Sequence, residues 1–228
     1  MTTGQPHNQA LDEETTGELR RYVALLLQAN SQVRIVGPRD ETTLWDDQIV
    51  SSLSLLPLLP ERGCVIDVGT GGGIPGAVLA ICRRDLDFTL LDSQSRKTRA
   101  LGAIVDALGL ANAHVVCARS EEHAAERRES YDCAVVCAVS DAGVVAEYLS
   151  PLVRVGGTLL AMKGSSAAEE VAPMAGRWGE IGLSEPQLHP YRQGDHTNHV
   201  VVWEKVSPCP AKYPRRPGRA EKVPWWRR

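Results

Sequence analysis

Short apolar runs rich in β-branched residues alternate with helical patterns along the centre of this chain. Strands are expected at residues 64–68, 88–91, 114–117, 133–136 and 158–162, and helices at residues 96–108, 144–152 and from Pro75 onward. Strands that are apolar along their whole length are typical of a parallel sheet covered by helices on both faces. The alternation therefore predicts an α/β fold with a doubly wound, mostly parallel sheet.

The segments on either side of this region extend the predicted fold. Residues 18–30 and 44–56 have the periodicity of two amphipathic helices, separated by Gly37-Pro38. A helical stretch at 167–178 is followed by strand patterns at 187–191 and 199–205, which predict a hairpin that adds an antiparallel strand near the sheet edge. We expect an N-terminal helical cap (residues 1–60), a main domain (61–206) and a tail (207–228) that forms an extended, mobile arm unless it is bound to something.

The composition excludes several classes of protein. With 43% hydrophobic and 23% charged residues the chain is ordinary for a globular protein. Its longest apolar stretch, residues 53–60, is too short to span a membrane, and residues 1–17 show no export signal, so we expect a cytoplasmic protein. The six cysteines form no C-x-x-C pair and the six histidines show no ligand spacing. We therefore expect reduced thiols and no metal site.

Charge is divided unevenly along the chain. The net charge of the whole is −3, but residues 212–228 hold seven cations and one acid, a net +6 against −9 for the rest. With Tyr213, Trp225 and Trp226 this tail suits contact with a nucleic acid, although a solubilising arm has a similar composition. A second basic run, Arg96, Lys97 and Arg99, indicates either phosphate contacts or a solvated helix start.

The chemistry centres on a glycine-rich segment after the first predicted strand, Val65-Ile66-Asp67-Val68-Gly69-Thr70-Gly71-Gly72-Gly73-Ile74-Pro75-Gly76. Glycines at a strand exit permit a tight turn and let a cofactor approach the backbone. The pattern alone suits a nicotinamide dinucleotide as well as S-adenosylmethionine. An acid at Asp67 would repel a pyrophosphate but attract a sulfonium, and Asp92 after the second strand is placed to bind ribose hydroxyls, so we favour S-adenosylmethionine.

Several motifs together resemble the 16S ribosomal RNA small-subunit methyltransferase G family, also called glucose-inhibited division protein B. The resemblance extends from Val36 to Trp225. It comprises Val36-Gly37-Pro38-Arg39 with Leu44-Trp45-Asp46, the segment 67–76, Leu90-Leu91-Asp92-Ser93 with Arg96, Lys97 and Arg99, Arg119-Ser120-Glu121-Glu122, Met162-Lys163-Gly164, and Lys212-Tyr213-Pro214-Arg215-Arg216-Pro217-Gly218. It implies a Rossmann-like class I methyltransferase fold, with residues 61–206 as the cofactor-binding domain, and methyl transfer to N7 of one guanosine in 16S ribosomal RNA.

The resemblance also implies positions for the cofactor contacts. They fall on Gly69, Ile74, Ser120 and Glu121, with Asp92 near the ribose. Together with the residues of the glycine motif, the predicted cofactor-binding set is Asp67, Gly69, Gly71, Gly73, Ile74, Asp92, Ser120 and Glu121. We expect the glycines to shape the loop, the two aspartates to hold the amino-acid and ribose ends, and Ser120 and Glu121 to flank the adenine.

Two departures from the family bear on the acceptor. Cys137 stands where the family has a cofactor-contacting arginine, and Asp47-Gln48 replaces an arginine-histidine pair. The favoured acceptor is ribosomal RNA or the small ribosomal subunit. The alternatives are a diverged paralogue that methylates a small molecule in specialised metabolism, and a cofactor-binding protein without catalysis.

No catalytic residue follows from the sequence, and guanine N7 carries no proton to remove. The candidates are Arg119, either near the mouth of the site or paired with Glu122, and Cys137, either a pocket residue or a strand-end thiol.

Overall fold

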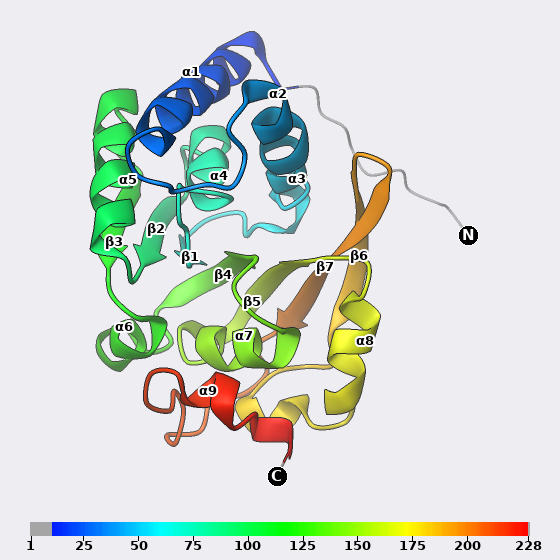
Figure 1. Ribbon diagram of the computed structural model, residues 1–228. Coiled ribbons are helices and arrows are strands. Elements are labelled where there is room, and N and C mark those ends of the chain that lie inside the picture. Colours follow the sequence, from blue (N-terminus) through cyan, green and yellow to red (C-terminus); the bar gives the residue numbers. More distant parts are fainter. Residues whose placement is uncertain (1–10, 228) are drawn as a thin grey trace.

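A seven-stranded sheet forms the centre of the protein in the computed structural model, which describes residues 11–227 (Figure 1). Its strand order is β3-β2-β1-β4-β5-β7-β6. The strands are β1 (Cys64–Val68), β2 (Asp87–Asp92), β3 (Ala113–Cys117), β4 (Tyr131–Cys137), β5 (Val153–Lys163), β6 (Gln187–Gln193) and β7 (His196–Glu204). The first five run parallel, β7 is antiparallel to β5, and β6 forms the edge. The predicted mostly parallel sheet and its terminal hairpin are confirmed.

Helices cover both faces of this sheet. One face carries α1 (Glu13–Asn30), α3 (Val50–Leu53), α4 (Gly76–Cys82) and α5 (Ser95–Leu108); the other carries α6 (Ser120–Glu126), α7 (Ala142–Leu149) and α8 (Ala167–Val171) (Figure 1). Alternate strand residues enter the two cores: Val65 packs in the first and Ile66 in the second, both fully buried. Strands buried on both sides explain why the sequence shows continuous apolar runs.

The N-terminal cap packs directly on the first core. Asp12 caps α1 by accepting a hydrogen bond from the Thr15 amide at 2.7 Å, and an i, i+3, i+4, i+7 stripe is fully buried: Leu19, Tyr22, Val23 and Leu26. The second predicted helix is present but irregular. It comprises α2 (Glu41–Thr43), a π-helical turn (Leu44–Ile49) and α3, then a short 3₁₀ turn at Leu56–Leu58.

Two further segments differ from the sequence prediction. Helix α6 is not expected from the sequence, because seven residues with three acids in SEEHAAE show no clear apolar period. The helix expected over 167–178 ends at Val171 and continues as a 3₁₀ turn, Ala172–Met174, whose second residue is Pro173. Proline has no N–H for the helical ladder and restricts the residue before it, which explains the interruption.

The prediction of an extended, mobile tail is wrong. Cys209, Tyr213, Ala220 and Trp225 are all buried, and the segment forms helix α9 (Arg219–Lys222) and a 3₁₀ turn at Trp225–Arg227. The tail lies against α7 (Figure 1). Its proline and arginine content suggested an arm, but its aromatic residues complete the second core.

Arginine side chains fix the backbone of the tail. Arg128 donates to the carbonyls of Tyr213 at 2.7 Å and Cys209 at 2.5 Å. Arg215 bonds the buried carboxylate of Glu147 at 2.5 and 2.7 Å and the Val223 carbonyl at 2.7 Å. These contacts satisfy backbone groups that no regular secondary structure pairs.

Residues 1–10 lie outside the described part of the chain, so the expectation of no export signal at 1–17 falls partly there. Within residues 11–227 no helix is long and apolar enough to cross a membrane. The domain boundaries at residues 60 and 206 stay a prediction.

Candidate functional site

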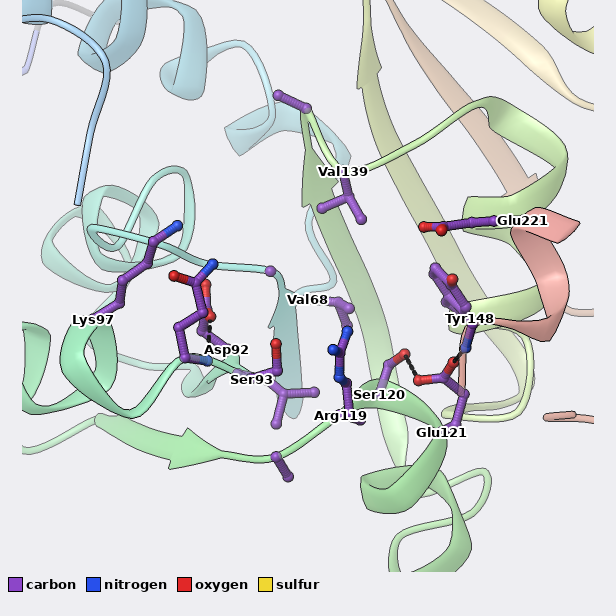
Figure 2. Close-up of a pocket in the computed structure, with 16 residues that line it drawn as sticks. Val68, Asp92, Ser93, Lys97, Arg119, Ser120, Glu121, Val139, Tyr148 and Glu221 are labelled. Atoms are coloured by element: carbon purple, nitrogen blue, oxygen red, sulfur yellow. Dashed lines mark hydrogen bonds between the residues drawn. The ribbon is translucent and has the colours of Figure 1, made fainter. Parts of the chain in front are cut away.

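A cavity of about 280 Å³ opens at the carboxyl ends of the central strands, between the sheet, α6, α7 and the tail (Figure 2). Clefts at this end of a parallel sheet are the usual ligand sites of doubly wound folds. The lining residues are Val68, Gly69, Leu91, Asp92, Ser93, Gln94, Lys97, Ala118, Arg119, Ser120, Glu121, Ala138, Val139, Tyr148, Gly218 and Glu221.

The glycine-rich loop begins at the cavity wall, and backbone hydrogen bonds join it to β2 and to itself. The amides of Gly69 and Thr70 both donate to the Leu91 carbonyl, at 2.8 and 3.0 Å, and the Gly73 amide donates to the Thr70 carbonyl at 2.7 Å. Gly73 has φ +100°, and a Cβ there would lie 2.8 Å from carbons of both Ala77 and Leu101. A side chain at this position is excluded by conformation and by space.

Asp67 supports the loop from beneath. Its carboxylate is fully buried, and Oδ2 accepts the Thr70 hydroxyl at 2.6 Å and the Gly76 amide at 2.9 Å. Burial raises the pKa of Asp67 to about 7, against the opposing effect of these two hydrogen bonds. Its Oδ1 is buried with no hydrogen-bond partner among the described residues. The carboxylate therefore fixes the start and the end of the loop at once.

Two more side chains hold the same loop. Asp92 accepts the Gly71 amide at 3.0 Å and the Gln94 amide at 2.8 Å, which joins the loop to the end of β2. Tyr22 of α1 donates its hydroxyl to the Gly72 carbonyl at 2.8 Å, and burial raises its pKa well above the usual value. The N-terminal cap thus takes part in building the site, which the sequence did not lead us to expect. The available signal was a hydroxyl within the otherwise apolar stripe of α1.

The opposite wall comes from α6, α7 and the tail. The Ser120 hydroxyl donates to Glu121 Oε2 at 3.1 Å, and the Gly218 amide donates to Glu121 Oε1 at 3.3 Å. Tyr148 and Glu221 face the same space (Figure 2). Burial, and the negative charges of Glu121 and Glu221, raise the pKa of Tyr148 above its usual range, so its hydroxyl keeps its proton. Tyr148 and Glu221 were also missed, because they lie in segments without a recognisable motif.

Acidic groups outnumber basic ones around the cavity. Asp92, Glu121 and Glu221 line it together with Lys97 and Arg119. The backbone N–H of Arg119 donates to Glu122 at 3.2 Å, and Arg119 also lines the cavity (Figure 2). An excess of carboxylates suits a ligand that carries positive charge.

The predicted cofactor residues divide into two groups. Gly69, Asp92, Ser120 and Glu121 line the cavity, and so does Arg119. The others, Asp67, Gly71, Gly73 and Ile74, lie behind them in or under the glycine loop and shape it.

Cys137 is outside the cavity lining. It ends β4, half-buried against the first core, and burial together with the charge of Asp67 raises its pKa to about 11. A thiol with that pKa is protonated at neutral pH and is a poor nucleophile.

The loop after β4 passes from Cys137 into the cavity wall at Ala138 and Val139. Lys163 at the end of β5 holds it, donating to the Ser140 carbonyl and pairing with Glu170 at 2.8 Å. Glu170 also accepts the Ala142 amide at 3.0 Å. Within residues 11–227 no cluster of three histidine, cysteine or acidic residues has the arrangement of a metal site.

The family described as rRNA small subunit methyltransferase G matches residues 15–190. The chain belongs to this family. A ribosomal RNA small subunit methyltransferase G from Moorella thermoacetica is 35% identical over 221 residues, which cover 94% of this chain and 92% of the relative. One from Alkaliphilus metalliredigens is 34% identical over 220 residues, with the same coverage of both chains.

Solved structures agree with the fold. A structure described as an rRNA methylase from Streptococcus thermophilus superposes with a TM-score of 0.51 and 18% identity over 69% of this chain and 95% of that one. A putative rRNA methylase from Clostridium thermocellum gives a TM-score of 0.53 and 14% identity, over 71% and 97%. The predicted class I methyltransferase fold is confirmed, and the chain is an S-adenosylmethionine-dependent methyltransferase.

The residues of the cavity fit this cofactor. S-adenosylmethionine carries a sulfonium and an ammonium group, and the three lining carboxylates supply the complementary charge. Gly69 has φ +76°, and a Cβ at this position would lie 2.6 Å from the side chain of Val139. Only glycine therefore fits here, and it leaves the backbone open to the cofactor. The sequence-based choice of this cofactor over a dinucleotide agrees with the electrostatics.

Proposed function

We propose that the protein methylates N7 of a guanosine in 16S ribosomal RNA of the small ribosomal subunit. The observation that carries the proposal is an acid-lined cavity at the carboxyl ends of β1 and β2 in a chain whose relatives are named ribosomal RNA small subunit methyltransferase G. A ribosomal substrate would place the protein in the cytoplasm.

The proposed cofactor contacts follow from the lining of the cavity. When bound, S-adenosylmethionine supplies an electrophilic methyl group on a positively charged sulfur. Asp92 still has free lone pairs beyond its two backbone hydrogen bonds and would accept the ribose hydroxyls. Ser120 and Glu121 would flank the adenine from α6, and Gly69 would lie against the amino-acid part. Asp67, Gly71, Gly73 and Ile74 would act by holding the shape of the loop.

Methylation at N7 needs positioning more than proton transfer. The nitrogen offers a lone pair and has no proton to lose, so the protein has to align nitrogen, methyl carbon and sulfur. The protonated hydroxyl of Tyr148, which lines the cavity, agrees with a reaction that needs no base. Arg119, which lines the cavity, would bind the acceptor nucleotide electrostatically.

The test uses small ribosomal subunits isolated from cells that lack the guanine N7 mark. The protein is incubated with these subunits and with labelled S-adenosylmethionine, and the labelled nucleotide is mapped. We expect one label per subunit, at N7 of a single guanosine. Labelling of adenine, of guanine at another atom or of several sites would refute the proposal, as would transfer to a small-molecule extract but not to subunits.

A further inference from the structure

The tail segment 212–221 has two chemically different sides. Gly218 and Glu221 face the cofactor cavity, where Glu121 and Tyr148 are their neighbours. On its other side Lys212, Pro214, Arg215, Arg216 and Arg219 enclose a separate, open hollow of about 490 Å³. The one acid of this segment, Glu221, thus lines the cavity, whereas its four cations line the outer hollow.

Only one of the four cations of the outer hollow forms an ion pair within residues 11–227. Arg215 is neutralised by the buried carboxylate of Glu147. Lys212, Arg216 and Arg219 are exposed, and none of the three forms an ion pair within residues 11–227. The hollow therefore holds three cations without an ion pair within residues 11–227, on a chain whose net charge is −3. A cluster of this kind attracts a polyanion.

The hollow is also a built structure and does not depend on the ordering of a loose arm. Tyr213 and Ala220, which lie between the cationic residues, are buried in the core. Arg128 holds the Tyr213 carbonyl at 2.7 Å, and the Arg219 amide closes a turn on the Arg216 carbonyl at 3.0 Å. Binding there would not require the segment to lose conformational entropy first, and pre-organised sites bind more tightly for that reason.

We propose that this basic hollow, formed by Lys212, Arg215, Arg216 and Arg219, binds phosphate groups of the RNA backbone beside the methyl-transfer cavity. The inference rests on the proposed function for the identity of the RNA. Arginine suits phosphate because its planar guanidinium donates two parallel hydrogen bonds. Because one short segment separates the hollow from the cavity, a strand anchored at Arg216 and Arg219 has a nucleotide within reach of the cofactor.

The double variant Arg216→Gln/Arg219→Gln tests the proposal and leaves the Arg215–Glu147 pair intact. A matched control, Arg62→Gln/Arg127→Gln, removes two exposed arginines that flank the amino ends of β1 and β4, at the end of the sheet opposite the cavity. Both variants have the same net charge. Binding to a 16S ribosomal RNA transcript is measured at several salt concentrations, and the methylation of unmarked small subunits gives KM and kcat.

Counterion release sets the size of the expected effect. Each lost phosphate contact reduces the slope of the log binding constant against log salt concentration by about 0.9. At 0.15 M salt this loss corresponds to roughly fivefold weaker binding. The tail variant should bind RNA about 30-fold more weakly, with a slope smaller by about 2 and a raised KM at unchanged kcat. The control should stay within about twofold of the wild type. Calorimetry with S-adenosylhomocysteine should show the cofactor site of both variants intact.

Three results would overturn the inference: an unchanged salt slope in the tail variant, an equal loss in the control, or a fall in kcat without a change in KM. Failure of the proposed function gives a different pattern. In that case the wild type does not methylate small subunits, while the transcript-binding measurement still reports on the hollow.

Discussion

Replacing Trp225 by alanine tests whether the tail is an integral part of the fold. The indole is 2% exposed, lies edge-on to Trp178 at 5.7 Å between ring centroids, and donates from Nε1 to the Gly143 carbonyl at 3.0 Å. Truncating a buried tryptophan costs about 3–5 kcal/mol, and the orphaned carbonyl adds to this cost. We expect Trp225→Ala to lower the free energy of unfolding by about 4 kcal/mol.

Thermal unfolding and cofactor titration measure the effect. For a chain of this size, about 4 kcal/mol corresponds to a fall in Tm of roughly 8–16 °C. Trp225→Phe keeps most of the ring packing and loses the indole N–H, so it should cost only about 1–2 kcal/mol. Because the tail carries Gly218 and Glu221 into the cavity wall, Trp225→Ala should also weaken S-adenosylhomocysteine binding, although Trp225 does not line the cavity. A fall in Tm below about 3 °C, with normal cofactor binding, would refute the reasoning.

Three further variants test the loop and the strand-end thiol. Burial raises the pKa of Asp67 from 3.8 to about 7, so the folded state binds this proton more tightly than the unfolded chain does. The free energy of unfolding of the wild type should therefore fall relative to that of Asp67→Asn as the pH rises from 4 to 7, by on the order of 4 kcal/mol. Chemical unfolding between pH 4 and pH 8 measures this difference, and a difference that is independent of pH would contradict the reasoning. Gly73→Ala should abolish cofactor binding in calorimetry, whereas Gly102→Ala, in α5 with open space around it, should leave binding unchanged. Cys137→Ala should keep kcat within about twofold in the methylation assay, and a loss above tenfold would restore Cys137 as a catalytic candidate.

The sheet was predictable because its signal is carried by burial on both faces. Strand β1 matches its predicted range, and β2 to β5 each contain theirs, since apolar runs such as Cys133-Ala134-Val135-Val136 have no other stable place in a domain of this size. The position of the candidate cavity followed from the same logic, because a glycine-rich turn at the first strand exit has few structural alternatives.

The tail and α6 were not predictable from pattern alone. Helix α6 has seven residues, which is less than two helical turns and too short to show an apolar period. The stability of such a short helix comes from packing. In the tail, the buried residues Tyr213, Ala220 and Trp225 do not share one helix or strand: Ala220 lies in α9, Trp225 in a separate 3₁₀ turn and Tyr213 in neither. Their burial depends on partners far away in sequence, such as Gly143 and Arg128, which no local pattern reveals.

The two aspartates of the motif show why a sequence locates a site better than it assigns roles. The motif predicts both as cofactor ligands, and both have backbone partners in the glycine loop: Gly76 for Asp67, and Gly71 for Asp92. A glycine-rich loop leaves amides without a helix or strand to pair them, and a buried amide without a partner is costly. A carboxylate at the end of each strand satisfies these amides and fixes the loop for a ligand. An aspartate that contacts a cofactor and an aspartate that holds the loop look the same in the sequence, so only the structure separates the two roles. Asp92 lines the cavity, whereas Asp67 is fully buried beneath the loop.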